Sequence, residues 1–383
     1  MRIFAFLSSY DMTLAEIFAQ IPDQRIERRK LHRLPSILGI ALCATLCGAN
    51  DFKEMEEYGL AKIDLMKQLF DLPNGIPSHD TFNRVFKLIS PDAFSTVLTR
   101  CAADIVANLS GHHICIDGKC MRGTGEKGKK GNHCQTIVSA WVSELGLVIG
   151  QKSVEEKSNE ITAVPQVLDC LDISGATVSI DAMGCQREIA DKIAKQGGYY
   201  FLAVKGNQAT LHMEIARYFD TRKSGQQTDQ SKEYDHGRIE TRTSWVSNDL
   251  SSIHVANHWT DLKTIICVES EVEFKNKDQK RQETRYYISN AQLSAQRANK
   301  LARSHWGIEN QLHWHLDVTF KEDDNQTTTP NAAENLNTLR KLALSIIQKD
   351  KSSCKSKKVK IKTAAWNDQF LIKILKNANF DTQ

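Results

Sequence analysis

The sequence predicts a mixed α/β fold preceded by a helical N-terminal region. Residues 1 to about 110 carry apolar residues spaced by threes and fours, which is typical of amphipathic helices. From about residue 113 the pattern changes to short β-rich runs that alternate with helical segments. Such a succession predicts a mixed sheet flanked by helices, with functional groups at the carboxyl ends of its strands.

Length and composition define the class of protein. The 383 residues are 41% hydrophobic, which is enough for two or three globular domains. The 50 basic residues are nearly balanced by 46 acidic ones, so a nucleic-acid surface must come from local clustering of charge. The ten cysteines form no CxxC pair, which favours reduced thiols over a disulfide framework or a zinc cage. No run reaches the roughly 18 apolar residues of a membrane span and the N-terminus is a poor signal peptide, so we expect a cytoplasmic protein.

The N-terminal region shows helix boundaries and two basic segments. One helix is expected between Pro35 and Gly48. A Pro/Gly turn then leads to Ser78, the expected N-cap of a short helix that carries Arg84 and Lys87. This spacing fits a helix-turn-helix or an ordinary helical bundle with solvated charges. The segment "QRIERRKLHR", residues 24–33, fits a DNA-backbone arm or a solvated helix end.

The core pattern begins with three strands. "HICID", "QTIVSAWV" and "GLVIGQKSV" are β-rich, and the last two are separated by a hairpin signal, "SELG". A helix capped by Ser158 follows, then the strand "ATVSIDAMG", the helix "QREIADKIAKQG" and the strand "YYFLAVKGN". Residues 206–290 are expected to form a β-rich insertion. Helices resume with "SAQRANKLARSHWGIENQLHWHLDVTF", and "KSSCKSKKVKIK" is expected to be a flexible, solvated linker.

Two aspartates occupy matching positions. Asp117 in "ICIDGKCMRG" and Asp181 in "VSIDAMG" each end an apolar strand and precede a turn of small residues. If the strands are neighbours, the two carboxylates lie side by side, where their repulsion favours a divalent cation. Mg²⁺ prefers carboxylate oxygens and often shares its coordination with phosphate. Each aspartate alone also fits a turn or N-cap residue, but the matching contexts favour a half-site for metal.

The third candidate ligand is Glu309. In a helix it shares a face with His305, His313 and Leu316, and Trp306 and Trp314 are expected to anchor that helix on the sheet. An acid beside apolar neighbours is costly unless it is paired or metal-bound, so we place Glu309 against the metal. The rival acids are Asp317, the most serious of them, with Glu322, Asp323 and Asp324. A zinc site of His305, His313 and His315 is disfavoured because residues 313 and 315 point to different helix faces.

Basic and amide side chains near these acids are candidates for DNA phosphate contacts. Each fits a surface charge as well, although Lys119 and Lys205 follow strands that should end near the site. The candidates are Lys119, Arg122, Lys205, Asn207, Gln208, Arg238 and Arg242. Two metal ions bridged by a carboxylate can activate a water or a 3′-hydroxyl and stabilise the leaving oxygen, so three carboxylates with phosphate clamps suffice for phosphoryl transfer.

The motifs "IDGKCMRGT", "VSIDAMGCQ", "FLAVKGNQ", "HGRIETR" and "HWGIENQLHWHLDVTFKED", in this order, resemble those of the DDE transposases of bacterial insertion sequences. The resemblance is closest to the H-repeat-associated group found with Rhs elements and runs from about residue 20 to about 348. It implies a helical N-terminal DNA-binding domain over residues 1–110. It also implies a ribonuclease-H-like catalytic domain over residues 111–348 that contains the β-rich insertion, and a basic C-terminal tail over residues 349–383.

The resemblance further implies that Asp117, Asp181 and Glu309 form the catalytic, metal-binding triad. The expected cofactor is Mg²⁺, with two ions that Mn²⁺ can replace. The expected partners are double-stranded DNA, as inverted repeats and target, and a second copy of the chain. Relatives often carry Tyr, Arg, Glu and Lys in the last helix, whereas this sequence has Ala302, His305, Glu309 and Leu316. Either His305, with Lys321 beyond it, contacts phosphate in a different way, or this part of the pattern is absent from the subgroup.

Three functions follow from these observations. The first is a transposase that cleaves the ends of its own element and joins them to target DNA. The second is a DNA-binding or regulatory protein derived from a transposase, with little or no catalysis. The third is a metal-dependent nuclease without strand transfer. Metal-dependent nicking separates the second from the others, and joined products separate the first from the third.

Overall fold

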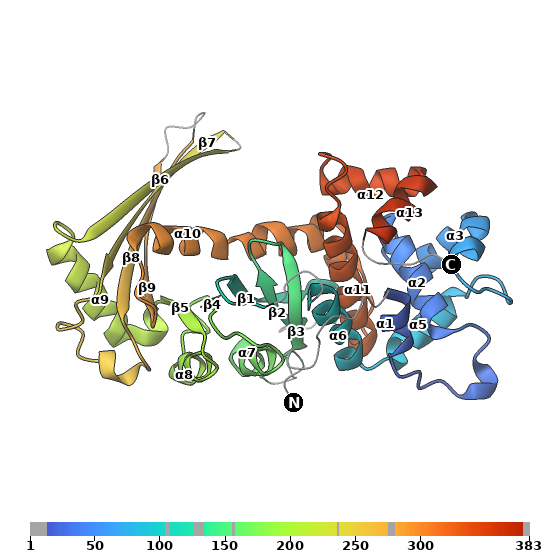
Figure 1. Ribbon diagram of the computed structural model, residues 1–383, viewed down its shortest axis with the longest axis horizontal. Helices are drawn as coiled ribbons and strands as arrows, with labels where there is room; N and C mark the ends of the chain where they lie inside the picture. Colours follow the sequence, from blue (N-terminus) through green and yellow to red (C-terminus); the bar gives the residue numbers. More distant parts are fainter. Residues whose placement is uncertain are drawn as a thin grey trace.

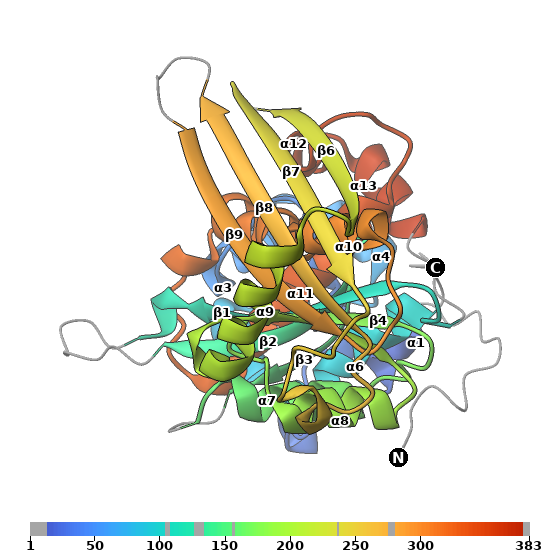
Figure 2. The same cartoon turned by 90° about the vertical axis from the view of Figure 1, so that its left-hand side faces the viewer.

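The centre of the computed structural model is a nine-stranded mixed sheet (Figures 1 and 2). The structure describes residues 14–103, 108–125, 134–154, 158–235, 237–274 and 280–377. The strand order is β3-β2-β1-β4-β5-β9-β8-β7-β6. The strands are β1 (His113–Met121), β2 (Gln135–Val142), β3 (Leu147–Ser153), β4 (Thr177–Ile180), β5 (Tyr199–Val204), β6 (Gln227–Asp235), β7 (Arg238–Ser247), β8 (Thr264–Phe274) and β9 (Lys280–Ser289).

The first five strands form the core of the sheet, in the order β3-β2-β1-β4-β5. β1 pairs antiparallel with β2 and parallel with β4, and β4 pairs parallel with β5. All four residues of β4 are buried, as expected for a parallel strand covered on both faces. The mixed sheet flanked by helices, predicted from the alternation of apolar runs, is therefore confirmed.

The β-rich insertion is also confirmed, and it extends the same sheet. After α9 (Ala209–Arg222), the strands β6 to β9 pair antiparallel with one another, and β9 pairs with β5. Figure 2 shows these strands as long arrows that rise away from the core as a blade. Gly237, with φ of 74°, lies at the β6–β7 turn, where a left-handed conformation favours glycine.

Helices cover both faces of the core sheet. α7 (Glu160–Asp169) and α8 (Arg187–Lys195) lie on one face, and α10 (Ala295–His305) crosses the other (Figure 1). α7 begins after Asn159, one residue later than the Ser158 cap that the sequence predicts. Beyond α10 the chain continues in two π-helical segments, Ile308–His313 and His315–Thr319. The long helix expected here is therefore interrupted, which changes the faces that its side chains occupy.

The N-terminal helices share a core with helices from the C-terminal part of the chain. They are α1 (Leu14–Ala19), α2 (Leu34–Leu46), α3 (Phe52–Ala61), α4 (Ile63–Leu69), α5 (His79–Leu88) and α6 (Pro91–Ala103). α11 (Pro330–Lys349) packs among α2, α5 and α6, and one apolar cluster joins all four. Ser78 is the N-cap residue of α5, as predicted.

The C-terminal segment differs from the flexible linker that its lysines suggest. It folds as α12 (Lys357–Trp366) and α13 (Asp368–Lys376). Leu371, Ile374 and Leu375 are buried in the same cluster as α2 and α11. Buried Lys360 forms an ion pair of 3.0 Å with Asp350. The apolar residues behind the lysines therefore dock this segment on the helical region.

The structure bears on two further expectations from composition, one about membrane spans and one about the cysteines. No helix within the described ranges is long and apolar enough to cross a membrane. Cys120 and Cys134 are joined by a disulfide, with Cα atoms 5.8 Å apart, so the expectation of reduced thiols is wrong for this pair. The pairing of β1 with β2 brings the two together, since Cys120 faces Thr136 in the register, two residues from Cys134.

Candidate active site

Asp117 and Asp181 come from adjacent positions of two neighbouring strands. In the parallel register of β1 and β4, Ile116 lies beside Ile180, and each aspartate is the next residue of its chain segment. Neighbouring strands are about 4.8 Å apart, so the two carboxylates emerge side by side. Asp181 follows the end of β4, as predicted. Asp117 lies inside β1, because β1 continues its pairing with β2 as far as Met121.

Backbone N–H groups hold both carboxylates. Oδ1 of Asp117 accepts a hydrogen bond of 2.9 Å from the N–H of Gly118. Oδ1 of Asp181 accepts from the N–H groups of Met183 and Gly184, at 3.0 and 3.2 Å. The turn role of Asp181 that the sequence allows is thus present, and it fixes the orientation of the carboxylate beside Asp117.

Glu309 lies on the first π-helical segment, which follows α10. Its side chain is exposed, while His313 of the same segment is buried and places Nδ1 3.6 Å from Oδ2 of Asp117. Burial first, and then the charges of Lys341 and Lys119, lower the pKa of His313 to about 3, so its imidazole is neutral. A neutral ring adds no positive charge to the acids around it.

The pKa of Asp117 reflects the negative charges of the acids around it. Burial first, and then the negative charges of Asp181, Glu160 and Glu309, raise the pKa of Asp117 to about 7. Glu160 is an acid that the sequence reasoning missed. It is the first residue of α7 and lines a pocket with Asp117, Gly118, Asp181 and Gly184. Its only local signal was its place near the start of the helix predicted after the third strand.

The donor set suits a hard divalent cation. Asp117, Asp181, Glu309 and Glu160 offer carboxylate oxygens, the ligands that Mg²⁺ prefers. In the described part of the chain, no group of three or more His, Cys, Asp or Glu side chains is arranged closely enough to hold a metal ion. The repulsion that raises the pKa of Asp117 is the kind of interaction that a cation among these carboxylates would remove.

Lys119 is held in a buried cluster of acids. Its side chain is 8% exposed, and Nζ lies 2.7 Å from Asp317, 3.2 Å from Glu322 and 3.3 Å from Asp323. Burial would lower the pKa of Lys119, but the charges of these carboxylates raise it. Three of the four rival acids for the metal are therefore paired with a lysine. Arg122, by contrast, has a guanidinium that is 83% exposed, 3.6 Å from Asp323.

The segment after β5 contacts the Asp181 turn. Nδ2 of Asn207 donates to the carbonyl of Ala182 at 2.6 Å, and Nε2 of Gln208 donates to the carbonyl of Cys185 at 2.9 Å. Lys205 is exposed at the start of this segment. Two of the three candidate phosphate contacts here therefore brace the turn that carries Asp181.

The two arginines of β7 differ. Arg238 is exposed at the start of the strand. Arg242 is 5% exposed, and its guanidinium lies 2.6 Å from Glu240 and 3.6 Å from Glu233. Arg303 of α10 also pairs with Glu233, at 2.9 Å. Glu233, which pairs with both Arg242 and Arg303, therefore links the blade to α10.

His305, the last residue of α10, belongs to a polar network between α10 and the sheet. Its Nδ1 is 2.8 Å from Oγ of Ser179, which is in turn 2.7 Å from Nε2 of His113. Burial is the main cause that lowers the pKa of His305 to about 4, so it carries no charge for a phosphate. The disfavoured zinc site does not form, since His313 faces Asp117 and His315 contacts Thr319 at 2.9 Å.

The anchoring role predicted for Trp306 and Trp314 is wrong. Their side chains are 38% and 50% exposed. The contact with the sheet is made instead by Gly307, where an added Cβ would lie 2.9 Å from the buried ring of Trp141 in β2. Trp306 is covered by Arg285, whose Cζ lies 4.2 Å from the centre of the indole ring. The π-helical turns account for this change, because they shift which residues face the sheet.

Comparison with known proteins gives matches over nearly the whole chain. A family described as "Transposase DDE domain" matches residues 109–346, and one described as "DDE_Tnp_1-associated" matches residues 15–101. The Escherichia coli K12 protein named "H repeat-associated putative transposase YhhI" is 36% identical over 94% of this chain and 97% of its own length. "Putative transposase YncI" of Escherichia coli O157:H7 is 36% identical over 95% and 94%.

Among solved structures, the chain is similar to one described as a piggyBac transposase synaptic complex with hairpin DNA. The similarity covers 94% of this chain and 78% of that one, with 11% identity and a TM-score of 0.39.

Proposed function

The chain belongs to the DDE transposase family, and we propose that it cleaves DNA at the ends of its own insertion sequence and joins the freed 3′ ends to target DNA. The observation that carries this proposal is the convergence of Asp117, Asp181 and Glu309 from two strands and a helical segment. The charges of the latter two both act on the carboxyl of Asp117. This electrostatic coupling supports a role for the three acids in one site.

In this reaction the three carboxylates would hold two Mg²⁺ ions, with Mn²⁺ as a substitute. When bound, such a pair supplies a nucleophile from a water or a 3′-hydroxyl and stabilises the leaving oxygen. The chain keeps the carboxylates in place: the Gly118 N–H holds Asp117, and the turn at Met183 and Gly184 holds Asp181. Asn207 and Gln208 brace that turn, so their proposed role includes positioning as well as phosphate contact.

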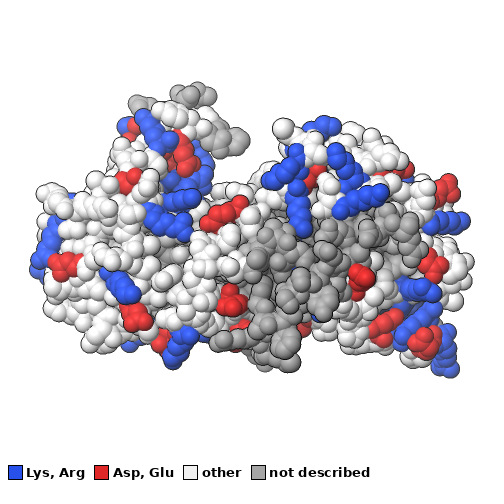
Figure 3. All heavy atoms as spheres, viewed as in Figure 1, with Lys and Arg blue, Asp and Glu red and all other residues white. Residues whose placement is uncertain are grey.

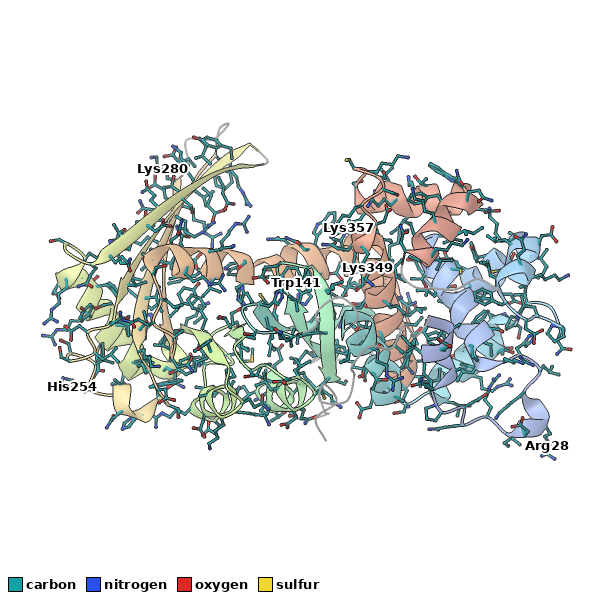
Figure 4. All side chains as sticks on the ribbon, in the orientation of Figure 1. Arg28, Trp141, His254, Lys280, Lys349 and Lys357 are labelled. Carbon is teal, nitrogen blue, oxygen red and sulfur yellow. A yellow bond between two sulfur atoms is a disulfide. The ribbon has the colours of Figure 1, made fainter. Side chains whose placement is uncertain are left out.

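We place the DNA across the face that α10 and the π-helical segments form between the blade and α12. Figure 3 shows Lys and Arg gathered on both sides of a notch in this face, and Figure 4 shows Lys280 on one side and Lys357 on the other. Trp314 offers an exposed ring for base or sugar contact. Exposed Arg122, Lys205 and Arg238 are the retained candidates for phosphate contact, whereas Lys119, Arg242 and His305 are engaged inside the protein.

Cleavage at two ends of one element requires that both ends be held together, so we propose a homodimer on DNA, acting at the bacterial nucleoid. The experiment that tests the function uses linear DNA that carries the inverted repeats flanking the coding region, with the full chain and Mg²⁺. We expect metal-dependent cuts at the repeat and joined products with target DNA. Cuts without joined products would favour a nuclease, and binding without cuts would favour a DNA-binding protein.

A further inference from the structure

Glu160 lies where no triad residue is expected, directly under strand β1. It opens α7, which packs against β2 and β3 on the face of the sheet opposite to α10. A Cβ atom added at Gly118 would overlap the Glu160 carboxylate. Gly118 is the residue after Asp117, so only a glycine at this position leaves space for the carboxylate beside the two aspartates.

The carboxylate of Glu160 has no compensating partner in the described part of the chain. Neither a Lys or Arg side chain nor an N–H group contacts it there, while burial and the charge of Asp181 raise its pKa. A half-buried carboxylate that faces two other acids is unfavourable in the absence of a cation. The arrangement therefore costs stability unless the pocket has a positively charged occupant.

We propose that Glu160 is a fourth carboxylate of the metal site, contributed from the α7 side of the sheet. The inference rests on the proposed function, since it concerns the cations that the three other acids would hold. With Glu160 present, four negative charges face two divalent cations, so the charges of site and metal balance. In this role Glu160 strengthens binding of the metal, and its loss lowers activity at limiting metal more than at saturating metal.

The test is calorimetric titration of the full chain with MnCl₂ alone, in the parent protein, Glu160→Gln and Glu188→Gln. Glu188 is the matched control, because it lies in the first turn of α8, as Glu160 does in α7, and its side chain is exposed. We expect Glu160→Gln to weaken Mn²⁺ binding at least about tenfold and Glu188→Gln to leave it unchanged. Circular dichroism of both variants verifies that α7 and α8 are formed.

A second measurement is the Mg²⁺ concentration that gives half-maximal cleavage of element-end DNA. We expect it to rise about tenfold in Glu160→Gln, with most of the rate recovered at saturating metal. If Glu160→Gln binds Mn²⁺ as the parent does, or if Glu188→Gln weakens binding equally, the fourth-ligand role is overturned. If the parent itself binds no metal and cuts no DNA, the proposed function fails together with this inference. A parent that binds and cuts while Glu160→Gln is unaffected refutes the inference alone.

Discussion

Nζ of Lys119 in β1 lies 2.7 Å from Oδ1 of Asp317 in the second π-helical segment. This ion pair connects the strand that carries Asp117 to the helical region that carries Glu309. Glu322, with a side chain only 1% exposed, lies 3.2 Å from the same ammonium group. Removal of the lysine would take this partner from Asp317 and would leave buried Glu322 paired with Arg340 but without Lys119, which is costly in a protein interior.

Lys119→Met is therefore expected to lower the free energy of unfolding by about 3–5 kcal/mol, the range for breaking a buried ion pair. Urea denaturation of the metal-free protein measures this. Lys195→Met is the control, because the ammonium of Lys195 is 73% exposed and its pair with Asp191 is a surface pair. Equal stability of the two variants would show that Lys119 is not a structural ion-pair residue.

Asn or Gln in place of the acids is expected to abolish cleavage. Asp117→Asn, Asp181→Asn and Glu309→Gln should each reduce the rate of element-end cutting about 10³-fold or more, since each removes a charged ligand. Asp172→Asn is the matched control for Asp181, because Oδ1 of Asp172 accepts the N–H of Ser174 in a similar turn contact. Cleavage by Asp181→Asn at the parent rate would reduce Asp181 to a turn residue.

Gly307→Ala is expected to displace Glu309, two residues along the chain. The new Cβ would lie 2.9 Å from the Trp141 ring, and overpacking of this kind costs about 1–3 kcal/mol. A shift of about 1 Å at a catalytic group can cost about 10²-fold in rate, so cleavage should fall further than stability alone explains. Gly150→Ala in β3 is the control, since its nearest neighbour would be 3.5 Å away. Thermal melts and cleavage assays would contradict the idea if both variants behaved like the parent.

Glu334 is expected to make stability depend on pH. Burial first, and then the charge of Asp92, raise its pKa from 4.5 to about 7, so the folded protein holds a proton that the unfolded chain has lost between these values. The free energy of unfolding should therefore fall as the pH rises from about 4.5 to about 7, and the loss is complete above that window. In Glu334→Gln the fall should be smaller, because the contribution of Glu334 is removed while that of Asp117, whose pKa is also raised to about 7, remains. Urea titrations at pH 5 and pH 7 test it, and identical slopes in parent and variant would contradict it.

Lysines on α12 are expected to contribute to DNA affinity through phosphate contacts. The double variant Lys358→Ala, Lys362→Ala removes two exposed charges and should reduce the slope of log affinity against log salt by about 2. Lys192→Ala with Lys195→Ala, on α8 across the sheet, is the control. Fluorescence anisotropy at several salt concentrations measures the slope, and an unchanged slope in the α12 variant would move the DNA path elsewhere.

The sequence alone determined the order of strands and helices, the β-rich insertion and the two matching aspartates. These features follow from local patterns, because apolar periodicity reports which face of an element is buried. The parallel pairing of Ile116 with Ile180 then brings Asp117 beside Asp181, as the repeated strand-and-turn pattern predicts. The motif resemblance led to the family to which the chain belongs.

Only the tertiary structure decided which charged groups are engaged and which remain exposed. Lys119 and His305 look like phosphate contacts in sequence, but their partners Asp317 and Ser179 come from distant segments. Glu160 reaches the site only because α7 begins under Gly118. Such outcomes depend on the packing of elements far apart in the chain, and burial then fixes the charge of each group. A local pattern carries no record of those neighbours, so the sequence could name Asp117, Asp181 and Glu309 but could not find Glu160.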